Sequence, residues 1–210
     1  AAPTTAPPTT TVPPTTTPPP TTTTTTTTTV PPRAAWLPPA DVPTTLYFDV
    51  PGAVDLAAEP LLPLTRTAPT ALGVADADGD GRTGITLERL GNEISFGLGA
   101  PTDATIRGGA SGVVYVSTAS LLASTVSVRA RLMVCDASGA CTVVSERTGS
   151  ALVTVLALLP INYNFGTIDV TVPAGGSLRV VLDVPASSSG DALLNADATL
   201  SASAITVIFR

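Results

Sequence analysis

Alternation of apolar and polar side chains dominates the chain after residue 44. It is clearest between residues 126 and 134, where one set of alternate residues is apolar and the other is mostly polar: Val126, Val128, Ala130, Leu132 and Val134 against Ser127, Arg129, Arg131 and Met133. Successive side chains of a strand point to opposite faces, so one face of this segment enters a core and the other meets solvent or a partner. The pattern predicts a half-buried strand.

Nine further segments have the composition of strands and are separated by clusters of Gly, Pro, Asn and Ser: residues 46–50, 84–90, 93–98, 112–118, 142–147, 151–159, 165–172, 178–184 and 198–209. No stretch keeps a helical period. Many short strands at fairly even spacing indicate a sandwich of two antiparallel sheets. We therefore expect an all-β fold, a jelly-roll-like antiparallel β-sandwich.

The first 32 residues differ sharply from the rest. They consist of 17 Thr, 10 Pro, 3 Ala and 2 Val, which leaves no side chain large enough to build a core. We expect an extended Thr/Pro-rich tail, either an O-glycosylated stalk or a bare flexible spacer. The expected glycan carriers are its threonines: Thr4, Thr5, Thr9, Thr10, Thr11, Thr15, Thr16, Thr17, Thr21, Thr22, Thr23, Thr24, Thr25, Thr26, Thr27, Thr28 and Thr29.

The chain then divides into a hinge over residues 33–43 and a β-sandwich domain over residues 44–210. Trp36 and Leu37 are the only large apolar residues of the hinge, so we expect the hinge to dock onto the neighbouring domain. The domain is long enough to bury a real core. No apolar run approaches the roughly 18 residues that span a bilayer, so no transmembrane segment is expected.

Composition excludes several functions. The sequence contains no His, its ten basic residues are all Arg, and its net charge is −6. Without His or Lys, the usual bases of nucleophilic and Schiff-base catalysis are missing, so we expect no enzyme activity. An acidic chain also lacks the basic face that nucleic acid or an anionic membrane requires.

The sequence indicates an exported protein. It begins Ala-Ala-Pro, as does a mature terminus after signal-peptide removal, so we expect a secreted, extracellular protein. Cys135 and Cys141 bracket a short turn-like loop between two strand-like segments. A disulfide there would staple two antiparallel strands, and a reduced buried pair is the alternative.

The sharpest motif is Asp-Ala-Asp-Gly-Asp-Gly-Arg at residues 76–82, which resembles the Asp-rich loops of EF-hand-like and dockerin-like sequences. Carboxylates at alternate positions, followed by a glycine, suit a hard cation such as Ca²⁺. The expected ligands are Asp76, Asp78, Asp80 and the Arg82 carbonyl, completed by Glu88, although the twelfth position of the loop is Leu87. The alternative is a solvated acidic turn that Arg82 partly neutralises.

Four segments follow one another in the second half of the chain: ATIRGGASGVVYVS, TVSVRARLMVCDASGACTVVSERT, GTIDVTVPAGGSLRVVLDVP and LLNADATLSASAITVIF. Their strand order, from about residue 106 to residue 209, resembles a galactose-binding-like jelly roll, such as the sandwiches appended to secreted hydrolases. Pro173-Ala174-Gly175-Gly176-Ser177-Leu178 resembles the family's turn before its penultimate strand, without the family's His. The resemblance implies the fold and says little about ligands.

Two site hypotheses concern the domain itself. Tyr163 and Phe165, with Asn162 and Asn164, would line a carbohydrate site at a loop end, although most of the eight aromatic residues are expected in the core. A glycosidase would need a pair of carboxylates, and the only two close glutamates after the acidic loop are Glu88 and Glu93. Nothing in the sequence distinguishes these two from ordinary surface charges.

These observations lead to two functional hypotheses. The first is a structural subunit of an extracellular filament, resembling subunits of glycan-coated fibrils, in which the tail contacts the next copy head to tail. Its partner is the chain itself, through apolar anchors at Val12, Val30, Trp36 and Leu37 or through strand exchange. The second is a stalked module that binds carbohydrates or surface glycans. Ca²⁺ and O-linked glycans are the expected cofactors.

Overall fold

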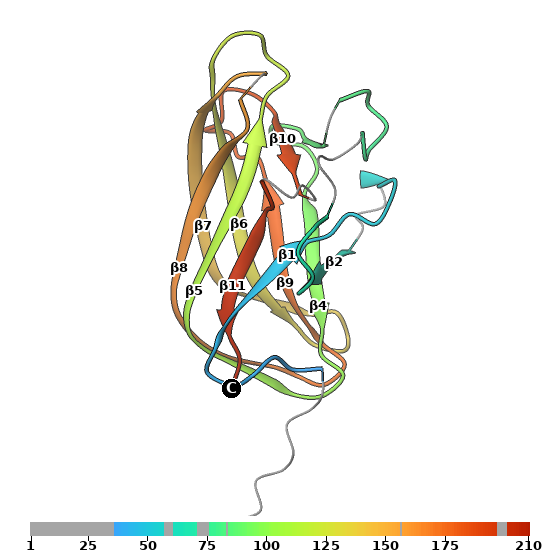
Figure 1. Cartoon of the computed structure of the whole chain (residues 1–210), viewed down its shortest axis with the longest axis vertical. Coiled ribbons are helices and arrows are strands. Elements are labelled where there is room, and N and C mark those ends of the chain that lie inside the picture. Colours follow the sequence, from blue (N-terminus) through green and yellow to red (C-terminus); the bar gives the residue numbers. More distant parts are fainter. Residues whose placement is uncertain (1–35, 57–60, 71–75, 83, 156, 197–200) are drawn as a thin grey trace, which may run out of the picture. The chain divides into compact units, whose positions relative to one another are not determined.

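The computed structural model describes residues 36–56, 61–70, 76–82, 84–155, 157–196 and 201–210, all within one compact unit that spans residues 33–210. These residues form eleven strands (Figure 1): β1 (Pro43–Phe48), β2 (Leu61–Thr65), β3 (Ile85–Leu87), β4 (Ile94–Gly99), β5 (Ala104–Ser117), β6 (Ser124–Cys135), β7 (Cys141–Val153), β8 (Leu159–Val172), β9 (Ser177–Asp183), β10 (Ala192–Asn195) and β11 (Ala204–Ile208). The described part of the chain contains no helix that could cross a bilayer.

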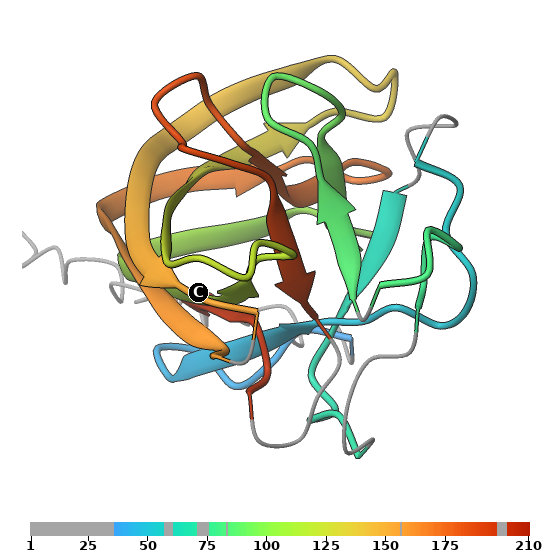
Figure 2. The same ribbon diagram turned by 90° about the horizontal axis from the view of Figure 1, so that it is seen from above.

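The strands build a jelly-roll-like sandwich of two layers (Figure 2). One layer centres on β5, which pairs with β8 along one edge and with β10 and β11 in succession along the other. The second layer runs β2-β4-β9-β6-β7. Strand β1 pairs with both β11 and β2 and so joins the layers. All these ladders are antiparallel except the short parallel pair β2–β4. The predicted all-β sandwich is confirmed.

The core lies between the two layers and is aliphatic with a few aromatic rings. Leu46 and Leu132, from opposite layers, are fully buried, and the rings of Phe48 and Phe96 stack with centroids 4.4 Å apart. Offset or stacked rings add to the free energy that burial of their area already supplies.

Strand β6 has the two faces that its alternation predicts. Val128 and Leu132 are buried in the core. On the opposite face, Arg129 and Arg131 both reach Asp183 of β9, with N–O distances of 3.0 and 3.1 Å. Arg131 also pairs with Glu93. The polar face therefore carries a network of charges that neutralise one another and that lies across two neighbouring strands.

Several strand predictions need correction. Residues 151–159 are not one strand, because β7 ends at Val153 and a tight turn, closed by a bridge between Thr154 and Ala157, precedes β8. Strands β2 and β10 were not predicted. Strand β2 contains a proline, which argues against a ladder, and β10 has only four residues.

The hinge docks as predicted. Trp36 and Leu37 pack against the core of their own domain, and the Trp36 indole Nε1 donates a 3.0 Å hydrogen bond to Thr102 Oγ1. This packing needs no neighbouring subunit. The other predicted anchors, Val12 and Val30, lie outside the described residues, as do the tail and its threonines.

The predicted disulfide is confirmed. Cys135 ends β6, Cys141 begins β7, and the two are direct partners in the ladder, joined by an S–S bond. The turn between them is closed by Asp136, whose Oδ1 accepts hydrogen bonds from the backbone N–H groups of Ser138 and Ala140 at 2.8 and 3.0 Å. The hydrogen bond from the Ser138 hydroxyl, the largest cause, and these backbone bonds lower the pKa of the Asp136 carboxyl.

Candidate metal centre

The acidic loop over residues 76–82 lies immediately before β3, at the edge of the first layer. Its ends are fixed by the backbone: Asp76 forms a bridge with Gly84, and the Ala77 carbonyl accepts a 2.6 Å hydrogen bond from the N–H of Val54. Gly79 and Gly81 have φ angles of 77° and 82°, which only glycine adopts without strain. The alternation of Asp and Gly is what lets the chain turn here.

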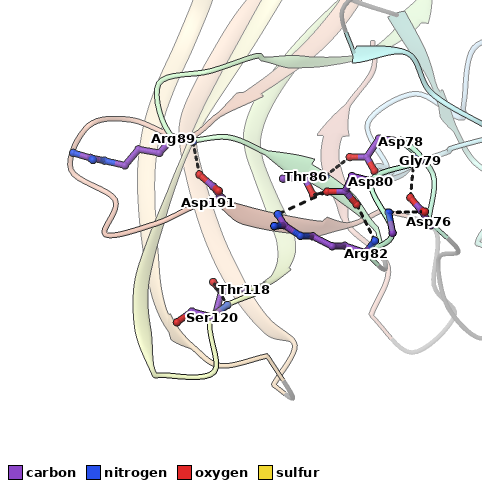
Figure 3. Close-up of polar contacts among 11 residues, drawn as sticks. Asp76, Asp78, Gly79, Asp80, Arg82, Thr86, Arg89, Thr118, Ser120 and Asp191 are labelled. Carbon is purple, nitrogen blue, oxygen red and sulfur yellow. Dashed lines mark hydrogen bonds and ion pairs between the residues drawn. The ribbon is translucent and has the colours of Figure 1, made fainter.

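The three carboxylates of this loop converge (Figure 3). One oxygen from each of Asp76, Asp78 and Asp80 lies within 4.8 Å of the others. The Asp76 carboxylate stabilises the turn of the loop, because its Oδ1 and Oδ2 accept hydrogen bonds from the N–H groups of Gly79 and Gly81 at 2.7 and 2.8 Å. Three negative charges held this close repel one another unless a cation lies between them.

Thr86 of β3 fixes the other two carboxylates. Its backbone N–H donates to Asp78 Oδ2 at 2.6 Å, and its hydroxyl donates to Asp80 Oδ2 at 2.5 Å. The second oxygen of Asp78, Oδ1, is buried and has no hydrogen-bond partner. Leaving a buried charged acceptor unsatisfied costs more than the roughly 1–3 kcal/mol typical of a neutral group. A cation bound beside this carboxylate would supply the partner that Oδ1 lacks.

Asp80 is held in its ionised form. Its pKa is lowered chiefly by the hydrogen bond from the Thr86 hydroxyl, with smaller contributions from the Arg82 N–H and the Arg82 charge. The Arg82 guanidinium lies 3.7 Å from Asp80 Oδ2. This is the partial neutralisation that the acidic-turn alternative expects. It is an exposed contact and reaches only one of the three carboxylates.

The loop opens onto a hollow of ≈ 590 Å³. The residues around it come from three segments and include four carboxylates and one guanidinium: Val54, Asp55, Leu56, Asp78, Asp80, Arg82, Thr86, Glu88 and Asn92. Glu88, the predicted completing ligand, is exposed and stands on this hollow outside the group of three converging carboxylates. Arg82 lines the same hollow.

Sequence reasoning missed three residues at this site. Thr86 orients two of the carboxylates, while Asp55 and Asn92 line the hollow beside them. Asp55 arrives from the segment before β2, held close by the Val54–Ala77 hydrogen bond. No spacing in the sequence signals it, since the contact depends on how the chain folds back.

The proposed aromatic sugar site is wrong. Tyr163 and Phe165 are buried in the core, where their rings stack 5.9 Å apart. The Tyr163 hydroxyl donates a 3.0 Å hydrogen bond to the Val128 carbonyl of the opposite layer. Asn162 and Asn164 alternate with these rings and point away from the core, so the four side chains do not share one surface.

The comparisons with known proteins concern the fold. The chain is similar to a CocE/NonD family hydrolase from Staphylococcus aureus, with a TM-score of 0.62 and 11% identity over 82% of this chain and 37% of the hydrolase. An α-amino acid ester hydrolase matches with a TM-score of 0.52 and 12% identity over 80% of this chain and 36% of that enzyme. An aminopeptidase from a marine sediment Thaumarchaeota archaeon matches with a TM-score of 0.55 and 10% identity, again over 80% of this chain and 36% of the other.

This chain thus spans little more than a third of each of these proteins, and at such identity the likeness shows the fold alone. No protein-family model matches the sequence, and neither does any curated protein.

These findings overturn the filament-subunit hypothesis drawn from the sequence. The similar structures named above are hydrolases, so that hypothesis is wrong, and the resemblance to fibril subunits has no support. The alternative, a stalked carbohydrate-binding module, has no aromatic site at Tyr163 and Phe165, because both side chains are buried in the core. The expectation that the chain is not an enzyme is weakened, since the fold occurs within hydrolase chains.

Proposed function

We propose that this chain is a non-catalytic β-sandwich domain whose acidic loop binds a calcium ion that stabilises the fold. The observation that carries the proposal is the buried Oδ1 of Asp78, which has no hydrogen-bond partner and belongs to a carboxylate within 4.8 Å of two others. A divalent cation would satisfy this oxygen and offset the repulsion between the three charges.

The choice of calcium rests on the donor atoms. The loop offers carboxylate oxygens and no nitrogen or sulfur ligand, and oxygen-only sites select hard cations. Ca²⁺ takes six to eight oxygens in a flexible geometry, which suits an exposed loop with Asp55, Glu88 and Asn92 on the adjoining hollow. Mg²⁺ demands a tighter octahedral arrangement.

The residues around the site indicate which segments of the chain a bound ion would join. Asp76 and Asp80 belong to the loop, Thr86 to β3, and Asp55 to the segment that precedes β2. An ion bound here would hold the acidic loop and the segment before β2 together at the edge of the first layer. Stabilisation of the folded state is therefore the expected consequence of binding.

The non-catalytic part of the proposal rests on the sequence. The chain has neither His nor Lys, so a Ser-His pair of the kind that many ester hydrolases use is not available from its own residues. The hydrolases of similar fold are nearly three times as long as the part this chain matches. Hydrolysis of p-nitrophenyl acetate by the purified chain, above the buffer rate, would overturn this part.

The calcium site is tested by thermal unfolding with chelator and with calcium. With calcium at about 100 times its dissociation constant, the free energy of unfolding should rise by about 2.7 kcal/mol. For a domain of this size, the melting temperature should then rise by roughly 5–10 °C. Asp78→Ala should abolish this difference, because it removes the buried ligand.

The matched control is Asp136→Ala. Asp136 is also a turn carboxylate with several hydrogen bonds to it and a lowered pKa, yet it lies outside the group of three carboxylates. This variant should keep the full calcium response, whatever its own melting temperature. Identical melting curves of the unmodified chain with and without chelator would contradict the calcium site and mean that the loop is only an acidic turn.

A further inference from the structure

Arg82 places a positive charge beside the acidic loop (Figure 3). Its guanidinium Nη1 lies 3.7 Å from Asp80 Oδ2. This separation is too long for a hydrogen bond, so the guanidinium acts on the carboxylate through its charge. Among the described residues that line the hollow next to the loop, Arg82 is the only basic one. The loop therefore carries its own counter-ion, next to the carboxylates that would bind calcium.

The backbone and the side chain of Arg82 have separate roles. The Arg82 N–H donates a 2.8 Å hydrogen bond to Asp80 Oδ1, and the N–H of Gly81 donates to Asp76. These main-chain groups hold the turn of the loop, and Arg82→Gln would keep them. The Arg82 side chain is 45% exposed. Its charge can therefore be removed with little change in the packing of the loop.

A bound cation and Arg82 would act on the same carboxylate. A calcium ion lies about 2.3–2.6 Å from its ligand oxygens, so an ion held by Asp80 would lie within roughly 8 Å of Arg82 Nη1. This distance is shorter than the Debye length of about 10 Å at 0.1 M salt, so the repulsion between the two cations is only partly screened. Arg82 therefore stabilises the loop without an ion and disfavours the loop with one.

We propose that Arg82 competes with calcium for the acidic loop and so sets the calcium concentration at which the loop fills. This role of Arg82 rests on the proposed calcium site, whose affinity it adjusts. The guanidinium offsets part of the repulsion among Asp76, Asp78 and Asp80, and a divalent ion would offset more of it. The loop would then be filled only where calcium is abundant.

The sign of the effect separates this role from a structural one. If the guanidinium merely oriented Asp80, removing it would loosen the site and weaken calcium binding. However, the Thr86 hydroxyl and the Arg82 N–H already hold the two oxygens of Asp80, at 2.5 and 2.8 Å. Removing the guanidinium should therefore leave Asp80 in place and strengthen calcium binding.

The test is isothermal titration of calcium into the chelator-treated full chain and into Arg82→Gln. The dissociation constant should fall about three- to tenfold in this variant, because a nearby positive charge is gone. Arg82→Lys keeps a positive charge at the same position. Its dissociation constant should stay within about twofold of that of the unmodified chain.

Thermal unfolding gives a second measurement, in which the two effects of Arg82 have opposite signs. In chelator, Arg82→Gln should melt slightly below the unmodified chain, because the carboxylates lose their counter-ion. At one fixed calcium concentration, calcium should raise the melting temperature of Arg82→Gln by more than that of the unmodified chain, because the variant binds the ion more tightly.

The matched control is Arg107→Gln, which removes the same charge from another exposed ion pair, that of Arg107 with Asp169 at 3.1 Å. Arg107 lies near the start of β5, whereas β10, the partner of β3, pairs with the other end of that strand. The control variant should bind calcium as the unmodified chain does.

An unchanged or raised dissociation constant in Arg82→Gln, with calcium still bound by the unmodified chain, would overturn the role of Arg82 and leave the calcium site standing. Equal tightening in Arg107→Gln would overturn this role too, because net charge alone would then account for the effect. Calcium binding by none of these chains would overturn the calcium site itself, and the role of Arg82 with it.

Discussion

At the scale of a single residue, Tyr163 shows how one buried polar group ties the layers together. Its ring stacks on Phe165, and its hydroxyl crosses the core to the carbonyl of Val128. Burial, followed by the nearby negative charge of Asp183, raises the pKa of Tyr163 above its ordinary value of about 10. The ring is therefore neutral in the folded chain at a pH where the unfolded chain ionises it.

This difference predicts a loss of stability in alkali. The unfolded chain binds fewer protons than the folded chain above about pH 10, so the free energy of unfolding falls as pH rises. Tyr163 alone should contribute a slope of about 1.4 kcal/mol per pH unit at most. Below pH 10 its contribution should be constant.

Urea unfolding of the unmodified chain and of Tyr163→Phe, from about pH 8 to pH 11.5, measures this slope. The comparison cancels every other titrating group. The variant should be less stable by about 1 kcal/mol at neutral pH, because the Val128 carbonyl loses its donor. The gap should narrow above pH 10, and a constant gap across the whole range would contradict the assignment.

At the scale of elements, the edge formed by β7 and β8 closes the sandwich without a ladder between these strands among the described residues. Side chains of β7 make the connection: Ser145 Oγ and Arg147 Nε donate hydrogen bonds to the carbonyls of Phe165 and Asn164, both at 2.9 Å. Gly149 lets the strands approach, since a Cβ there would lie 2.2 Å from Ile161 Cγ2. The layers meet here through packing.

This contact predicts that Gly149→Ala destabilises the domain. The added methyl group overlaps a buried isoleucine of β8 that has little room to move, and overpacking of this kind costs about 1–3 kcal/mol. Chemical denaturation gives the change in the free energy of unfolding. The control is Gly109→Ala on β5, where a Cβ meets nothing within 4 Å. It should change stability by no more than about 0.5 kcal/mol, and equal losses in both variants would contradict this account of the edge.

At the scale of the whole molecule, the sequence predicts the strands that have one buried and one polar face. Strand β6 shows this most directly, since its alternation carries through to a core face and a charged face. The turn after Val153 escapes prediction because it contains neither Gly nor Pro, so residues 151–159 read as one apolar strand. The order of the strands in the two layers depends on long-range pairing that no local pattern contains.

The candidate metal centre could also be predicted only in part from the sequence. Asp76, Asp78 and Asp80 are neighbours in the sequence, so their spacing alone predicts that they converge. Thr86 lies beside the loop because Gly84, just before β3, forms a bridge with Asp76, and Asp55 is brought there by the backbone contact of Val54. Asn92 lines the hollow from the segment after β3. These contacts depend on the fold. Tyr163 illustrates the opposite error, because an aromatic flanked by asparagines looks like a surface site until the layer that buries it is known.

The central claim is that the acidic loop binds calcium, and isothermal titration of calcium into the chelator-treated chain tests it most directly. We predict about one site per chain, with a dissociation constant no weaker than about 10⁻³ M, the limit for extracellular calcium modules. The same titration into Asp78→Ala should give no binding heat, while Asp136→Ala should bind as the unmodified chain does. Absence of binding to the unmodified chain, or equal binding to Asp78→Ala, would contradict the claim.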